Sequence, residues 1–344
     1  MITTKMAIPL QTNRKLKQKL WKKLLIFLLF QMLFTCLTFP ALVFYGPFEN
    51  VKNTIVGMSM NSLRHQYIAK LFLSDQSIQE IMRGSAAVDP TQKGEAVNTL
   101  QFGVNHSDKI EVYDVRGKDF VGKLMVVYDP TSIVIGLSEL LPKSGETTSV
   151  VAKRNQAVAA INAGGFMDKG WTGTGGVPMG FVIHDGEVAY NQQQSEEVKQ
   201  DTVAFTKEGM LIVGRHSIAQ LKGYGVKEAV SFGPPLIVNG KPTIASGDGG
   251  WGFAPRTAIG QRENGEVLML VIDGRSFDSF GATLKDAQDI LMEYGAVNAV
   301  NLDGGSSSTM VLNDKVINKP SDRLGERAVP SVFLVAPGKG GESN

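Results

Sequence analysis

Three strands expected from the sequence each end in an aspartate or asparagine that is followed closely by glycine: Asn162, Asp273 and Asp303. A rigid sheet holds side chains at such positions, and the glycines let backbone amides approach a ligand closely. A carboxylate held there can donate a proton or stabilise positive charge on a sugar during glycoside cleavage. We therefore predict a site at one edge of a sheet, with Asp303 and Asp273 as its catalytic carboxylates.

Each of these side chains also has a structural interpretation. Asp303 can cap its own turn through the glycine amides that follow it, and Asp273 can close a turn as an ion pair with Arg275. Asn162 can bond the local backbone instead of a ligand. Glu326, just before the last expected strand, is a further candidate acid. The residues themselves leave both interpretations open.

Other residues in these segments suit a phosphate or a sugar. Arg256 carries a planar guanidinium that can bind phosphate in a bidentate manner, although it can also be a structural partner of an aspartate. Phe166, Trp171 and Trp251 can stack on a sugar face or belong to the core. The predicted substrate-binding residues are Asn162, Gly164, Gly165, Trp251, Arg256, Arg275, Gly304, Gly305, Ser306 and Ser307.

Hydrophobic spacing indicates the elements that hold these residues. An apolar strand covers Val267–Ile272, and Thr283 with Asp286 forms the Ser/Thr-x-x-Asp/Glu pattern that begins a helix. Gly295 is a natural helix end, and a second strand covers Ala296–Leu302. Further short strands are expected at 110–115, 122–128, 132–137, 157–161, 181–184, 203–206, 211–213, 236–238, 257–261 and 329–335. Because glycine-rich turns separate most of them, we predict an α+β domain that is predominantly β-sheet with a few packed helices.

Five motifs occur in a fixed order along the chain: INAGGF at 161–166, SFGPPLIVNGKP at 231–242, APRTAIG at 254–260, VIDGR at 271–275 and NLDGGSSSTMV at 301–311. In this order they resemble the phosphodiester glycosidase family. Ala163 departs from the family, which often has glycine there, so the backbone has slightly less freedom to approach a ligand. The resemblance implies a hydrolase that cleaves the glycosidic bond of a sugar-1-phosphodiester, such as a GlcNAc-1-phosphodiester, in a cell-envelope or extracellular glycan.

Two other functions fit the same residues. One is a non-catalytic protein of the same fold that binds or assembles exopolysaccharide, and the other is a metal-dependent phosphodiesterase. Aspartates in glycine-rich loops can bind Ca²⁺ or Mg²⁺, so either ion is possible, although no cofactor is certain. The sequence has no cysteine cluster and no His-x-x-x-His, which argues against a zinc enzyme. It has no Walker loop and no G-x-S-x-G, which argues against a nucleotide-dependent kinase and an ester hydrolase.

The N-terminal region is typical of a membrane anchor. Seven basic residues and no acid precede Leu24, and residues 24–45 carry no charge. At about 1.5 Å per residue this segment can cross a hydrocarbon core of about 30 Å. The basic flank should stay in the cytoplasm, which places the rest of the chain outside. A cleaved signal peptide is the alternative, but the long basic region and the lack of a clear Ala-x-Ala site favour an uncleaved anchor.

We expect five regions in the 344 residues. They are a basic cytoplasmic segment at 1–23, a transmembrane anchor at 24–45, a helical stem and linker at 46–108, the phosphodiester glycosidase domain at 109–336 and a tail at 337–344. The only cysteine, Cys36, lies in the anchor, so the exported part has no disulfide. A net charge of +2 gives no reason to expect nucleic acid as a partner. The expected partners are the membrane and a glycan with phosphodiester-linked sugars; the sequence does not predict an oligomeric state.

Overall fold

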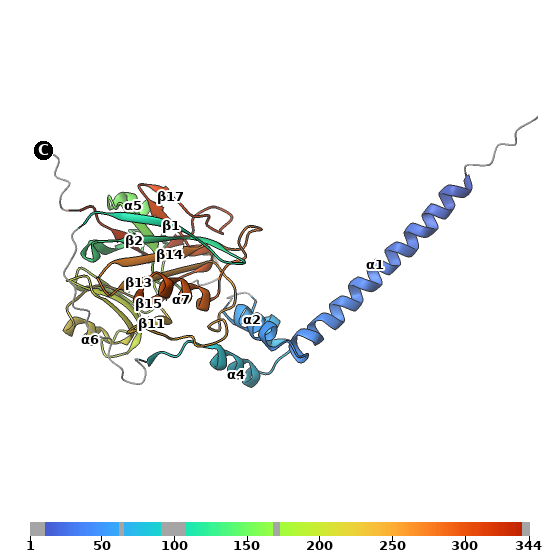
Figure 1. Ribbon diagram of the computed structural model, residues 1–344, viewed down its shortest axis with the longest axis horizontal. Helices are drawn as coiled ribbons and strands as arrows, with labels where there is room; N and C mark the ends of the chain where they lie inside the picture. Colours follow the sequence, from blue (N-terminus) through green and yellow to red (C-terminus); the bar gives the residue numbers. More distant parts are fainter. Residues whose placement is uncertain (1–10, 62–64, 91–106, 168–172, 339–344) are drawn as a thin grey trace, which may run out of the picture.

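The computed structural model describes residues 11–61, 65–90, 107–167 and 173–338, so Trp171 lies outside the described residues. A long helix, α1 (Gln11–Tyr45), extends from a group of short helices beside a β-rich domain (Figure 1). The strands pair antiparallel throughout the described sheets, and a few helices pack against them. This arrangement confirms the predicted α+β fold.

Helix α1 contains the apolar segment expected near the N-terminus. Within the described residues, 18–45 is the one helical stretch long and apolar enough to cross a membrane. The side chains from Leu20 to Leu42 are mostly exposed, as lipid-facing side chains would be. Length and composition fit a membrane anchor and a signal sequence alike.

Three short helices follow α1 and form the stem: α2 (Glu49–Met60), α3 (Tyr67–Lys70) and α4 (Asp75–Ser85). The Ser74 side chain caps α4 by accepting a hydrogen bond from the amide of Ser77. Val43 and Phe44 at the end of α1 are buried in one apolar cluster with Val56 of α2. The stem is therefore packed onto the end of α1.

The largest sheet contains the strands that carry the predicted carboxylates. Its strand order is β1-β2-β14-β13-β15-β11-β12. The bounds are Ile110–Arg116 for β1, Val121–Val127 for β2, Val267–Ile272 for β14, Arg256–Arg262 for β13, Ala296–Leu302 for β15, Pro235–Val238 for β11 and Lys241–Pro242 for β12. The expected bounds of β14 and β15 are confirmed to the residue.

Two five-stranded sheets and one pair of strands complete the β-structure of the described residues. The first sheet has the order β7 (Glu187–Asn191), β6 (Phe181–His184), β10 (Val226–Ser231), β8 (Gln200–Thr206) and β9 (Leu211–His216). The second has the order β17 (Lys315–Val316), β16 (Met310–Leu312), β5 (Ala159–Asn162), β19 (Ser331–Val335) and β3 (Ile133–Leu137). Strand β18 (Ala328–Val329) pairs with β4 (Glu146–Thr147).

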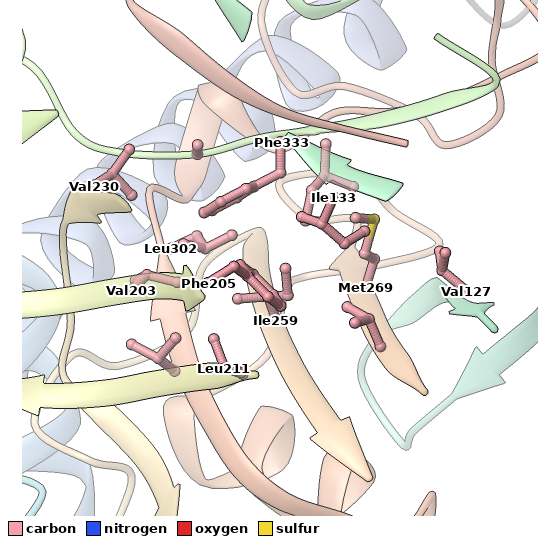
Figure 2. Packing of buried hydrophobic residues seen from close by; sticks show 14 of the residues in the cluster. Val127, Ile133, Val203, Phe205, Leu211, Val230, Ile259, Met269, Leu302 and Phe333 are labelled. Carbon is pink, nitrogen blue, oxygen red and sulfur yellow. The ribbon is translucent and has the colours of Figure 1, made fainter. Parts of the chain in front are cut away.

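The main core lies where these three sheets meet, and Figure 2 shows their side chains pointing toward one another. Phe205 of β8 and Phe333 of β19 meet edge to face, with ring centroids 5.9 Å apart. Leu302, the last residue of β15, is buried in the same cluster. Packing at this point fixes the end of the strand that leads into Asp303.

Three helices cover the outer faces of the sheets. Helix α7 (Leu284–Glu293) packs on the seven-stranded sheet, and Thr283 and Asp286 form the predicted capping box. Helix α5 (Thr148–Arg154) packs beside β5, β16 and β19. Helix α6 (Ile218–Gly223) is an addition to the predicted elements, although Ser217 and Gln220 form a capping box.

The core predicts the cost of removing an aromatic ring. Phe333→Ala should lower the free energy of unfolding by about 3–5 kcal/mol, because a fully buried ring is lost and a cavity remains. Chemical denaturation of the full chain in detergent, followed by circular dichroism, measures this. The matched control is Phe277→Ala, which removes a fully exposed ring and should change stability little. Equal losses in the two variants would contradict this description of the core.

Candidate active site

The backbone brings the predicted strand ends to one edge of the seven-stranded sheet. Strands β14 and β15 both run antiparallel to β13 and flank it, so both end where β13 begins. Asp273, Arg256 and Asp303 therefore come from adjacent strands at the same edge. The chains approach closely here: the amide of Gly305 donates to the Pro255 carbonyl at 2.9 Å. A Cβ at Gly304 would lie 2.8 Å from that same oxygen, so glycine is required at 304.

Asn162 connects this edge to the sheet that contains β5. Its Nδ2 donates to the carbonyl of Asp303, and its Oδ1 accepts from Thr257 Oγ1 at 2.8 Å and from the Thr309 amide at 3.1 Å. The Asp303 amide in turn donates to the carbonyl of Ala163 at 3.0 Å. Because the Asn162 side chain is fully buried and bonded to protein groups, these contacts favour a positioning role, and its predicted contact with substrate remains a prediction.

Asp303 is partly exposed at this edge. Burial raises its pKa from the ordinary value of 3.8 to about 6, against the opposing effects of a hydrogen bond from Ser307, the charge of Arg327 and the Gly304 amide. The two hydrogen bonds stabilise the ionised form, whereas desolvation favours the protonated form. A carboxyl group with a pKa near 6 can hold a proton close to neutral pH and give it up to a substrate.

Two arginines lie at the glycine-serine turn that follows Asp303, and we call them the arginine pair: Arg275 and Arg327. Arg275 Nη1 donates to Ser306 Oγ at 3.1 Å, and a Cβ at Gly305 would lie 3.2 Å from its Nη2. The guanidinium of Arg327 lies over the ring of Phe166, 5.1 Å from the centroid. Burial lowers the pKa of Arg275, and the charge of Arg327 lowers it further. Two guanidinium groups that repel each other beside a serine-rich turn make a favourable site for a phosphate.

Asp273 has different partners. Its Oδ1 accepts from Asn318 Nδ2 at 2.9 Å and from the Lys319 amide at 3.0 Å, and burial raises its pKa. Asn318 also donates to the Ser308 carbonyl at 3.1 Å and accepts from the Met310 amide at 2.8 Å. Through Asn318, Asp273 therefore supports the turn that carries the serines. These contacts favour a positioning role, and the predicted catalytic role of Asp273 remains a prediction.

The side chain of Arg256 points away from Asp303. Its Nε donates to the Ala282 carbonyl at 2.9 Å, and its Nη2 donates to the Gly252 carbonyl at 2.5 Å. Successive residues of a strand face opposite sides of the sheet, and the next residue, Thr257, faces Asn162. Burial lowers the pKa of Arg256 to about 10. These contacts favour a structural role for Arg256, whose guanidinium bonds backbone carbonyls, and its predicted contact with substrate remains a prediction.

The remaining predicted residues mostly have packing roles. Trp251 meets Phe232 edge to face, with centroids 6.3 Å apart, and lies beside the Arg256 guanidinium. A Cβ at Gly165 would lie 2.6 Å from the Phe232 ring, and the buried amide of Gly164 donates to Ser331 Oγ at 3.3 Å. These contacts explain both glycines through close packing. Direct contact with a ligand is therefore not required to account for Trp251 or the glycines.

Glu326 and Arg327, just before the last strands, have different partners in the structure. Glu326 accepts hydrogen bonds from the amide and the hydroxyl of Ser149 at the start of α5, so its carboxylate serves that helix and not the site. Arg327, the next residue, reaches Asp303 and was absent from the predicted site, as was Asn318. The signal for Arg327 was its place just before a strand, close to the position of Arg256 at the start of β13.

A site for Ca²⁺ or Mg²⁺ in this domain would need several oxygen ligands close together among the described residues. These residues contain no group of three or more His, Cys, Asp or Glu side chains placed to hold an ion. Binding of Ca²⁺ or Mg²⁺ therefore stays a possibility given by the sequence.

A comparison with protein families decides the classification. Residues 155–336 of the 344 match the family model described as phosphodiester glycosidase. The chain belongs to the phosphodiester glycosidase family. The matched span contains Asn162, the arginine pair and both predicted carboxylates, so the family assignment covers the whole of the site described above.

Curated relatives of this family member are similar over part of their length. It is 33% identical over 215 residues to the SPbeta prophage-derived uncharacterized protein YomE of Bacillus subtilis (strain 168), which covers 60% of this chain and 31% of YomE. It is 40% identical over 70 residues to N-acetylglucosamine-1-phosphodiester alpha-N-acetylglucosaminidase of Bos taurus, covering 20% of this chain and 13% of that enzyme. The chain thus spans less than a third of the length of either relative.

A solved structure supports the fold of this family member. The catalytic domain of zebrafish N-acetylglucosamine-1-phosphodiester alpha-N-acetylglucosaminidase, auto-inhibited by its pro-peptide, superposes with a TM-score of 0.61 at 23% identity. The similarity covers 72% of this chain and 91% of the zebrafish chain. It shows that the two proteins share a fold.

The raised pKa of Asp303 predicts a pH-dependent stability. The protonated carboxyl stabilises the folded state below pH 3.8, and this contribution is lost as the pH rises through about 6. Asp303→Asn has no carboxyl to ionise at this position, so its free energy of unfolding does not fall for this reason as the pH rises. From pH 4 to pH 8 its free energy of unfolding should therefore rise relative to that of wild type, by about 3 kcal/mol at most. Denaturant titrations at several pH values measure the difference.

The matched control for this experiment is Asp314→Asn, at an exposed turn after β16. Its difference from wild type should not change with pH. A constant difference between wild type and Asp303→Asn across the same range would contradict the raised pKa.

Proposed function

We propose that this protein hydrolyses the glycosidic bond of a sugar-1-phosphodiester in a cell-envelope or extracellular glycan. The observation that carries the proposal is the placement of a partly buried carboxyl, Asp303, near Arg327 and at the start of the turn whose Ser306 hydroxyl bonds Arg275. The family assignment supports a hydrolase of this class. The name of the bovine relative, which acts on an N-acetylglucosamine-1-phosphodiester, supports the choice of substrate.

The proposed chemistry assigns a role to each group. The guanidinium groups of Arg275 and Arg327 bind the anionic oxygens of the phosphodiester and neutralise the charge that develops as the phosphate leaves. Protonated Asp303 gives its proton to the bridging oxygen while the bond from that oxygen to the anomeric carbon breaks. Water adds to the anomeric carbon and restores the proton to Asp303. The products are the free sugar and a phosphomonoester on the acceptor.

The elements around the site explain how these groups are held. Asn162 fixes the backbone of Asp303, and Asn318 fixes the turn that contains Ser306 and Ser307. Groups that are fixed before substrate arrives need no reorganisation during the reaction, which is a main source of catalytic power. The glycines at 304 and 305 keep the turn close to Pro255.

The proposal predicts a specific isotope pattern. The full chain in detergent should release N-acetylglucosamine from UDP-N-acetylglucosamine, and in water enriched in oxygen-18 the label should enter the sugar. Cleavage of the P–O bond, as a phosphodiesterase performs it, would put the label in phosphate. Mass spectrometry of both products distinguishes the two reactions, and binding without turnover would indicate a non-catalytic protein.

A variant tests the role of Asp303 in the same assay. Asp303→Asn should lower kcat by about 100- to 10,000-fold, because the proton donor is lost. The activity of wild type should fall as the pH rises above about 6, as the carboxyl ionises. Asp314→Asn is the matched control and should retain activity. Full turnover by Asp303→Asn would refute the assignment of this residue.

We also propose that α1 is an uncleaved anchor, with 1–23 in the cytoplasm and the domain at 109–336 outside the cell. The long apolar helix and the basic residues before it support this arrangement. We expect protein purified from membranes to keep its N-terminus, as intact mass shows, and to resist alkaline extraction. An N-terminus that begins after Tyr45 would show that the segment is a signal peptide.

A further inference from the structure

Large apolar side chains project into solvent from two loops of the catalytic domain. Phe277 is 101% exposed, Phe280 64% and Leu324 95%. Phe277 and Phe280 lie between β14 and α7, and Leu324 lies between β17 and β18. We call these three residues the apolar rim. Exposed apolar side chains that gather in one part of a surface often mark a contact with a membrane or another protein.

The apolar rim borders the candidate site. The Phe277 loop contains Arg275, which bonds Ser306 at 3.1 Å. The Leu324 loop contains Ser321, whose Oγ donates to the Gly305 carbonyl at 3.4 Å. Asp322 in the same loop lies close enough to Arg275 for its charge to oppose the lowering of the Arg275 pKa by burial and Arg327. Both loops therefore contact the glycine-serine turn, and each carries exposed apolar residues of the rim close to that contact in sequence.

A continuous series of contacts connects this end of the domain to the stem. Ala254 and Ala282 bond each other at 3.1 and 2.9 Å, so the 250–254 loop runs beside the loop of Phe280. The Gly250 carbonyl accepts from Asn61 Nδ2 at 3.0 Å. A Cβ at Gly57 of α2 would lie 2.7 Å from the same oxygen. Helix α2 thus sits directly on the loop next to the rim.

The stem leads on to α1. Val56 of α2 is buried together with Val43 and Phe44 from the last turn of α1. Exposed apolar side chains continue beyond that helix at Phe48 and Val51. In Figure 1 the helices α1 and α2 lie at one end of the domain, and α6 lies at the opposite end. The rim is therefore at the end of the domain that α1 and the stem adjoin.

We propose that the apolar rim inserts into the outer leaflet of the membrane that α1 crosses. The proposal rests on α1 being an anchor, as proposed above, and it identifies the occupant of the rim as lipid. Aromatic and leucine side chains that bind at a membrane surface reach about 5–10 Å into the boundary between headgroups and acyl chains. The site then opens at the membrane surface, which suits a glycan attached to a lipid or lying against the membrane.

The charges near the rim favour an apolar mode of binding. Lys319 and Arg323 are exposed basic residues in the Leu324 loop, whereas Asp278 and Asp322 are acids in the two loops. Because both signs are present, neither an anionic headgroup nor a strongly charged protein is selected. Insertion should therefore take place in a neutral phosphatidylcholine bilayer and should change little with salt.

The test places a probe on the rim of the full chain. Cys36→Ser removes the only native thiol, Phe277→Cys introduces a new one, and an environment-sensitive fluorophore is attached to it. The labelled chain is reconstituted into phosphatidylcholine vesicles with and without lipids that carry a quencher in the acyl chain. The matched control carries the label at Tyr224→Cys, an exposed position just after α6 at the far end of the domain.

The lipid quencher should reduce emission from position 277 at least about twofold more than emission from position 224, because only the rim reaches the acyl boundary. Equal quenching at the two positions would overturn the proposal. A label at 277 that is shielded from aqueous iodide but not quenched by lipid would also overturn it, and would indicate a second copy or another protein on the rim.

The experiment separates this proposal from the proposed activity, because it uses no substrate. Flotation of the vesicles reports the anchor independently. If the chain floats with the vesicles but the label at 277 is not quenched, the rim proposal is wrong and the anchor proposal stands. A chain that fails to float overturns the anchor, and the rim proposal with it.

Discussion

The buried amide of Asn162 is the constraint on which the candidate site depends. One side chain bonds the end of β15 through the Asp303 carbonyl, β13 through Thr257 and the start of β16 through the Thr309 amide. Each of these partners is polar and lies in an apolar surrounding. A buried polar group without a partner costs about 1–3 kcal/mol, so the arrangement is strongly preferred over one in which the sheets shift. The position of a partly exposed carboxylate is thus determined by a residue that never meets solvent.

Burial acts on the charged groups of the site in opposite directions. It raises the pKa of Asp303 and lowers the pKa of Arg275, so both groups are less stable in their charged forms than they would be in water. Bringing Arg327 close to Arg275 adds repulsion. An anion bound near the two guanidinium groups would favour their charged forms.

Much of this arrangement could be predicted from local sequence. The apolar runs of β14 and β15 and the Thr283–Asp286 capping box specify three consecutive elements, and all three are confirmed. The meeting of Asp273 and Asp303 at one edge follows from those strands. The direction of Arg256 could not be predicted, because it depends on which face of β13 meets β5, and that pairing is set by residues nearly a hundred positions away. Arg327 and Asn318 enter the site through irregular loops, for which periodicity gives no information.

The contact between Gly57 and Gly250 bears on where this protein can find its substrate. The two backbones pack against each other there with no side chain between them. Such close packing limits the motion of the domain relative to α2. With α1 as the proposed anchor, helix and domain would then diffuse as one rigid body, and the candidate site would keep a constant height above the lipid. Encounters with substrate would take place by lateral diffusion in two dimensions. Sugars far out in a thick envelope would stay beyond reach, however abundant they are.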